Sequence, residues 1–141
     1  CMRLFVDTNI LVDFVCRREP FASDAKRLFA HGYIGDFELQ TSALSFVNAM
    51  YIGQKYNHDE VRTYLQQVST FVDVVDLKGK AVVEMLSSDW KDYEDATQNH
   101  TALLAGADYI ITRNKKDFKN STLPVCTIKE FFEIWEEKNR V

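Results

Sequence analysis

The chain has 141 residues, of which 46% are hydrophobic, and it carries a formal net charge of −4. This length predicts one domain with enough apolar residues to bury a core. The acidic balance argues against a general electrostatic binder of nucleic acid, which usually has a basic domain, but an enzyme can still meet nucleic acid through a local patch and a metal. No apolar run approaches the ~20 residues of a membrane helix. No secretory signal pattern is present either, so we expect a cytoplasmic protein.

The three cysteines give no sign of a disulfide framework or a zinc site. Cys1, Cys16 and Cys126 are an odd number and have no CxxC spacing, which suits reduced thiols. Cys1 precedes Met2, a natural start residue. We therefore expect Cys1 to be a remnant outside a single domain that spans residues 2–141.

Short apolar runs alternate with amphipathic stretches along the chain, which is typical of an α/β protein. The expected strands are residues 4–6, 37–41, 71–75, 107–111 and 124–126. The expected helices are residues 10–15, 23–33, 43–56, 59–68, 78–86, 89–104 and a last one capped by Thr127. Glu130 completes a capping box with Thr127, and Gly106 suits the end of the helix before it. These elements predict a three-layer α/β/α fold with a five-stranded, mostly parallel sheet.

Acidic and amide side chains fall at the ends of the expected elements. Asp7 ends the first strand, Asp92 and Asp95 begin a long helix, and Asn114 and Asp117 follow the fourth strand. In an open parallel sheet, ligands bind outside the carboxyl ends of the strands. Several carboxylates without equal numbers of cations would repel one another, and Mg²⁺ or Mn²⁺ would remove that conflict because hard cations take oxygen ligands. Such a cluster is suited to metal-assisted hydrolysis of phosphodiesters.

Each acid also has a simpler structural interpretation. Asp7 could only cap the helix that follows it, and Asp92 and Asp95 could be ordinary first-turn acids of a helix. Asp117 could be a loop acid beside several lysines.

Three segments together resemble the PIN-domain family, in particular the VapC-like toxins of bacterial toxin–antitoxin pairs. They are FVDTN at residues 5–9, DYEDA at residues 92–96, and ALLAGADYIITRNKKDF at residues 102–118. The resemblance covers nearly the whole chain in order and spacing. It implies a Mg²⁺- or Mn²⁺-dependent ribonuclease that often dimerises and is inhibited by a small antitoxin.

Carried over by position, the resemblance implies a catalytic and metal-binding set of Asp7, Asp92, Asp95 and Asp117, with Asn114 and Asn48 as further metal ligands. It also implies a substrate side to the site. Thr8 and Asn9 would hold the first turn, Thr112 would support the edge by hydrogen bonding, and phosphate-binding cations would stand nearby. That set is Thr8, Asn9, Thr112, Arg113, Lys115 and Lys116.

One departure from the family pattern bears on activity. The family usually places a Glu on its third helix, and in the matching stretch here, residues 41–49, Asn48 occupies that position. An amide oxygen can coordinate a metal but brings no charge, so we expect weaker metal binding, for which Asp92 could compensate.

Two other functions remain open. One is a PIN-like module that binds RNA or protein with weakened catalysis, because Asn48 lacks the charge of the usual Glu. The other is a doubly wound phosphoryl-transfer domain such as a response regulator. Against the second stand the absence of a glycine-rich phosphate loop and of a lysine at the end of the fourth strand.

Overall fold

The computed structural model describes residues 1–140. Its strands are β1 (Arg3–Val6), β2 (Glu38–Ser42), β3 (Val72–Val75), β4 (Tyr109–Ile111) and β5 (Val125–Cys126). Its helices are α1 (Thr8–Val15), α2 (Ala22–Tyr33), α3 (Ala43–Gly53), α4 (His58–Val68), α5 (Gly79–Met85), α6 (Tyr93–Leu104) and α7 (Ile128–Lys138). A 3₁₀ helix, η1 (Lys115–Phe118), follows β4. The fold class expected from the sequence is confirmed.

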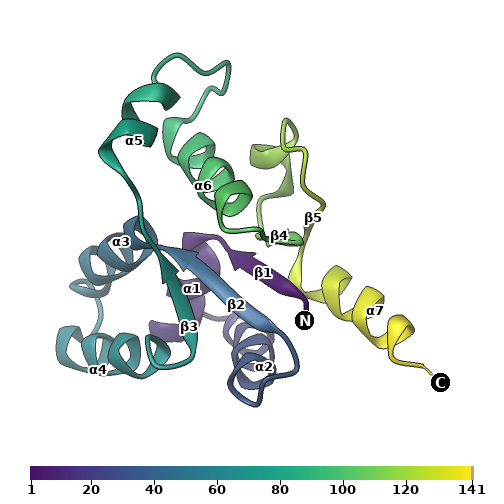
Figure 1. The fold of residues 1–141 in the computed structure, drawn as a ribbon. Helices are drawn as coiled ribbons and strands as arrows, with labels where there is room; N and C mark the ends of the chain where they lie inside the picture. Colours follow the sequence, from purple (N-terminus) through teal and green to yellow (C-terminus); the bar gives the residue numbers. More distant parts are fainter. Residues whose placement is uncertain (141) are drawn as a thin grey trace.

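The five strands form one parallel sheet in the order β3-β2-β1-β4-β5 (Figure 1). The chain winds outward from β1 to β3 and then crosses to the other side of β1 for β4. The strand order therefore reverses between β1 and β4, and in open α/β sheets the ligand crevice lies at such a point. The backbone N–H of Asp7 donates to the carbonyl oxygen of Ile111 at 2.9 Å, which joins the ends of these two strands.

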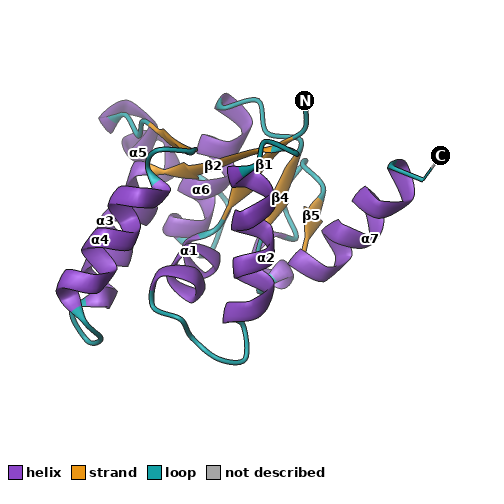
Figure 2. Cartoon of the chain, turned by 90° about the horizontal axis from the view of Figure 1, so that it is seen from below, coloured by secondary structure: helices purple, strands orange, loops and turns teal. Residues whose placement is uncertain are grey.

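Alternate side chains of the central strands enter two different cores. Leu4 and Val6 of β1, with Ile111 of β4, belong to the larger core, which includes buried residues of α1, α2, α3, α4 and α7. Phe5 and Ile110 point the other way, into a smaller core that includes Ala102 of α6 and Phe118 of η1. This alternation is the period of a β-strand buried on both faces. It gives the three layers, with helices on each side of the sheet (Figure 2).

Most element ends match the sequence expectations. The capping box of Thr127 and Glu130 is formed, and Gly106 takes a positive φ of 70° directly after α6, as a residue that closes a helix does. The helix expected over residues 89–104 begins only at Tyr93, because Asp92 adopts extended backbone and caps it. The 3₁₀ helix η1 was not expected, since its polar run KKDF has no apolar periodicity.

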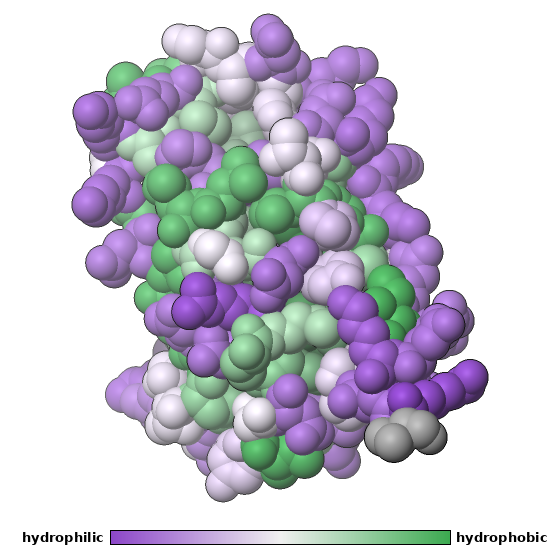
Figure 3. Space-filling model, turned by 45° about the vertical axis from the view of Figure 1, so that its right-hand side comes forward, coloured by the Kyte–Doolittle hydropathy of each residue, from purple (hydrophilic) through white to green (hydrophobic). Residues whose placement is uncertain are grey.

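The protein surface is largely polar, with apolar side chains emerging in several places on the face displayed in Figure 3. Within residues 1–140, no helix is both long and apolar enough to cross a membrane.

Candidate active site

Asp7 lies at the end of the central strand β1 and is only 7% exposed. Its carboxylate accepts hydrogen bonds from the backbone N–H of Thr8 at 2.8 Å and from the hydroxyl of Thr112 at 2.9 Å. Burial raises the pKa of Asp7 above its ordinary value; the hydrogen bonds from Thr112 and Thr8 oppose this shift, and repulsion from Glu94 and Asp117 adds to it. Asp7 also caps α1, so the simpler capping interpretation of this residue is confirmed.

The first turn of α6 brings further carboxylates to the same edge of the sheet. Burial raises the pKa of Asp95 to about 7, and repulsion from Asp92, Asp7, Asp117 and Glu94 acts in the same direction. Asp92 is the N-cap, and one of its carboxylate oxygens accepts from the N–H groups of Glu94 at 2.8 Å and Asp95 at 3.2 Å. One carboxylate oxygen of Asp92 is therefore engaged in stabilising the start of α6.

A buried polar network beneath these acids joins α1, α3 and α6. Gln98 of α6 donates through Nε2 to the hydroxyls of Thr8 at 2.9 Å and Ser45 at 2.7 Å. The two hydroxyls lie 2.8 Å apart. Because Thr8 follows Asp7 directly, this network fixes the position of α6 relative to Asp7. Sequence reasoning missed Gln98 and Ser45, since neither carries a charge.

Asn48, at the position where the family usually has a Glu, faces α6. Its side-chain amide donates to the carboxylate of Glu94 at 3.1 Å. Glu94 lies within the run of acids at residues 92–95, but sequence reasoning gave it no role. The available signal was its place between Asp92 and Asp95.

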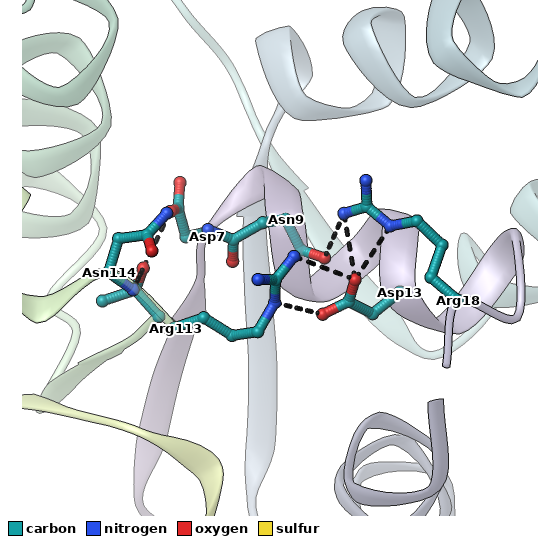
Figure 4. A network of polar contacts seen from close by, with 7 residues as sticks. Asp7, Asn9, Asp13, Arg18, Arg113 and Asn114 are labelled. Atoms are coloured by element: carbon teal, nitrogen blue, oxygen red, sulfur yellow. Dashed lines mark hydrogen bonds and ion pairs between the residues drawn. The ribbon is translucent and has the colours of Figure 1, made fainter. Parts of the chain in front are cut away.

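Four other expected site residues divide into two groups by their exposure. Asn114 and Asp117 are exposed at the site edge, and Asn114 lies beside Asp7 in Figure 4. The backbone N–H of Asn114 donates to the hydroxyl of Thr112 at 3.1 Å. Thr8 is 8% exposed and Thr112 is 0% exposed. These two threonines thus lie below the surface that a substrate would reach and act on the position of Asp7.

Two of the three basic residues proposed for the substrate side are engaged elsewhere. Arg113 pairs with Asp13, which is 1% exposed, at 2.7 Å, and Arg18 pairs with the same carboxylate at 2.9 Å (Figure 4). Lys115 pairs with Glu130 at 2.9 Å. Of the three, Lys116 alone forms no ion pair with another residue in the described part of the chain.

Asn9 lies in the first turn of α1, two residues after Asp7. Its backbone carbonyl accepts from Arg18 at 3.4 Å, while its buried side-chain oxygen has no hydrogen-bond partner among residues 1–140. A cavity of about 700 Å³ lies elsewhere, between α6 and the segment from β3 to α5, and contains none of the site carboxylates.

The donor set suits a hard divalent cation in its chemistry. Carboxylates from β1, α6 and η1 repel one another at one edge, and a bound cation would relieve that repulsion. Within residues 1–140, no three His, Cys, Asp or Glu side chains are grouped tightly enough to hold an ion as they stand. By chemical type and by their mutual repulsion, however, the carboxylates at this edge fit a hard divalent cation.

The parallel sheet with helices on both faces, and with acidic side chains at the point of strand reversal, places the protein in the class of three-layer α/β/α proteins. Residues 3–116 match the model of the PIN domain, and the chain belongs to the PIN-domain family. No curated protein sequence matches the chain.

Solved structures with the same fold include toxins of toxin–antitoxin pairs. A Klebsiella pneumoniae toxin–antitoxin complex is 27% identical with a TM-score of 0.62, over 89% of this chain and 97% of that one. Mycobacterium tuberculosis VapC20, described as a toxin that cleaves the sarcin–ricin loop, is 17% identical with a TM-score of 0.61, over 76% and 86%. Rickettsia felis VapBC2 bound to promoter DNA is 16% identical with a TM-score of 0.61, over 88% and 97%.

Proposed function

We propose that this protein is a metal-dependent endoribonuclease that hydrolyses RNA phosphodiester bonds as the toxin of a toxin–antitoxin pair. The observation that carries the proposal is that Asp7 and Asp95, from opposite halves of the chain, lie close enough near the point of strand reversal for the charge of Asp7 to act on Asp95. Both carboxyls have raised pKa values because burial disfavours their charged forms. Membership in the PIN-domain family and the likeness to VapC20 support the same activity.

Different residues at this edge of the sheet would have different roles in the reaction. Bound Mg²⁺ or Mn²⁺ would supply hydroxide at neutral pH and charge stabilisation for the phosphoryl group. Asp7 and Asp95 would hold the ion, with Asn114, Asp117 and Asp92 around them. Thr112 and Thr8 orient the carboxylate of Asp7, and Lys116 offers a cation to the RNA backbone.

Conservative substitution of the two leading ligands tests the proposal. Asp7→Asn and Asp95→Asn should each abolish Mg²⁺-dependent cleavage of RNA by the purified protein, because each removes an anionic ligand and keeps the side-chain size. Asp59→Asn on the exposed start of α4 is the matched control and should cleave as fast as wild type. Wild-type cleavage by either ligand variant would show that the site is assigned wrongly.

Asn48 favours a second candidate function, a PIN-like module that binds RNA or a partner without efficient catalysis. The amide at this position is neutral, so α3 itself brings no anionic ligand to the edge. A titration of the purified protein with Mn²⁺ separates the two candidates. Saturable binding together with RNA cleavage supports the ribonuclease, whereas neither at millimolar metal supports the module.

The partners that we propose are an RNA substrate, a small antitoxin and a second copy of the chain. Exposed apolar side chains on α3, α5 and α6 offer contact surface for protein partners. They are Val47, Tyr51, Val82, Val83, Leu103 and Leu104. Light scattering of the purified chain, alone and after co-expression with the product of a small neighbouring gene, tests both protein partners; a monomer that captures no such product contradicts them.

A further inference from the structure

Two layers of contact join α3 to α6. The inner contact is buried, between Ser45 and Gln98, at 2.7 Å. The outer contact lies at the edge of the site, between Asn48 and Glu94, at 3.1 Å. Asn48 is three residues after Ser45, and Glu94 is four residues before Gln98, so each pair lies on one face of its helix. The buried inner contact therefore sets the register that brings Asn48 opposite Glu94.

The direction of the outer hydrogen bond is fixed by the chemistry of its two groups. A carboxylate is a pure acceptor, and the amide of Asn48 donates through its NH₂ group. Among the described residues, Glu94 forms no ion pair, and this amide is the one side-chain donor that it meets. The side chain at position 48 thus holds a carboxylate at the site edge instead of being one.

Asp92 is less suited to make up the missing charge. One of its oxygens accepts two backbone N–H groups at the start of α6, and moving it would uncap the helix. Glu94 has no such duty and is close enough to Asp7 for its charge to act on that carboxylate.

We propose that Glu94 is the anionic metal ligand that takes the place of the Glu absent from α3, and that Asn48 is the residue that positions it through their hydrogen bond. The inference rests on the proposed metal-dependent function. It predicts that the carboxylate missing from α3 is supplied by α6 instead, so that the number of anionic ligands is unchanged.

Calorimetric titration with Mn²⁺ tests this on the full chain, without reference to catalysis. Measured at pH 8, Glu94→Gln should bind Mn²⁺ about tenfold or more weakly than wild type, because it loses an anionic ligand at constant size. Glu137→Gln on the exposed side of α7 is the matched control and should bind as wild type does. Wild-type affinity in Glu94→Gln overturns the proposal.

An exchange of the two groups sharpens the test. The double variant Asn48→Asp, Glu94→Gln puts the carboxylate on α3 and the amide donor on α6, and it preserves both side-chain lengths. Its Mn²⁺ affinity should return to within about threefold of wild type, because the number of anionic ligands is restored. An affinity as low as that of Glu94→Gln alone would mean that Glu94 does not replace a carboxylate of α3.

Asp7→Asn separates this inference from the proposed function. If Asp7→Asn loses Mn²⁺ binding while Glu94→Gln keeps it, only the role of Glu94 is wrong. If Asp7→Asn also binds normally, the metal site itself is misplaced. Circular dichroism of each variant checks that it is folded, which the exposure of Glu94 favours.

Discussion

Thr112, at the end of β4, donates a hydrogen bond of 2.9 Å to Asp7, at the end of β1, across a separation of 105 residues. Thr112 has no exposed surface, and its hydroxyl also accepts from the backbone N–H of Asn114 at 3.1 Å. The hydrogen bond that it donates favours the charged form of Asp7, whose pKa burial would otherwise raise further. The central acid of the site is therefore oriented by the strand beside it.

Removing this hydroxyl should cost both stability and metal affinity. Thr112→Val keeps the shape but leaves a buried carboxylate oxygen without its partner, so the free energy of unfolding should fall by about 1–3 kcal/mol. Chemical denaturation measures the loss. Thr101→Val is the control: its hydroxyl bonds only the carbonyl of Thr97 within α6, so the loss should be smaller. Equal losses in both variants would contradict a special contact to Asp7.

The raised pKa of Asp95 predicts how stability depends on pH in the metal-free protein. The folded state holds a proton on Asp95 up to about pH 7, whereas the unfolded chain releases it near the ordinary value of 3.8. Between these values the folded state binds more protons, so the contribution of Asp95 to stability is largest at the acidic end and declines as pH rises toward 7.

Thermal unfolding of wild type and Asp95→Asn between pH 5 and pH 8 measures this effect. The Tm of wild type minus that of Asp95→Asn should fall as pH rises and level off above pH 7, because Asn does not titrate. A difference that is independent of pH would rule out the shift. Mn²⁺ binding should weaken below pH 7, since protons compete for the same carboxylate.

Arg113 and Lys116 should affect different properties, although both follow β4. Arg113→Ala leaves the buried Asp13 with Arg18 alone and removes a cation that lies 3.8 Å over the ring of Phe21, so it should destabilise the fold by about 1–3 kcal/mol. Lys116→Ala should leave stability unchanged, weaken RNA binding, and reduce its dependence on salt. Both variants are compared by chemical denaturation and by RNA binding at several salt concentrations. A loss of stability in Lys116→Ala, or an unchanged stability in Arg113→Ala, would contradict the prediction.

Substitution of Gln98 should affect both the stability of the fold and the metal affinity of the site. Gln98→Leu removes two donated hydrogen bonds to Thr8 and Ser45 in a buried setting, so it should lower the free energy of unfolding by about 1–3 kcal/mol and weaken Mn²⁺ binding as well. Gln66→Leu on the exposed face of α4 is the control and should change neither. Unchanged metal affinity in a destabilised Gln98→Leu protein would mean that the network supports only the fold.

The amino-acid pattern alone was sufficient to predict the sheet and most of its helices. Apolar runs such as Leu4 to Val6 need partners on both faces, and only a layered α/β structure provides them. Local chemistry at Gly106 and Thr127 marks where helices end and begin. The acidic residues from Asp89 onward all suit the start of a helix, so the sequence pattern predicts a start at Asp89, whereas Asp92 is the N-cap and α6 begins at Tyr93.

The order of residue types along the chain is enough to predict that carboxylates lie where the strand order reverses, because parallel strands bring their carboxyl ends to one edge. The pairing of individual side chains there depends on how distant elements pack. Arg113 donates a hydrogen bond to the buried Asp13, and Glu94 accepts one from the amide of Asn48. Such pairings depend on the register between elements far apart in the chain. A buried contact like that of Gln98 with Ser45 sets this register, and no local pattern records it.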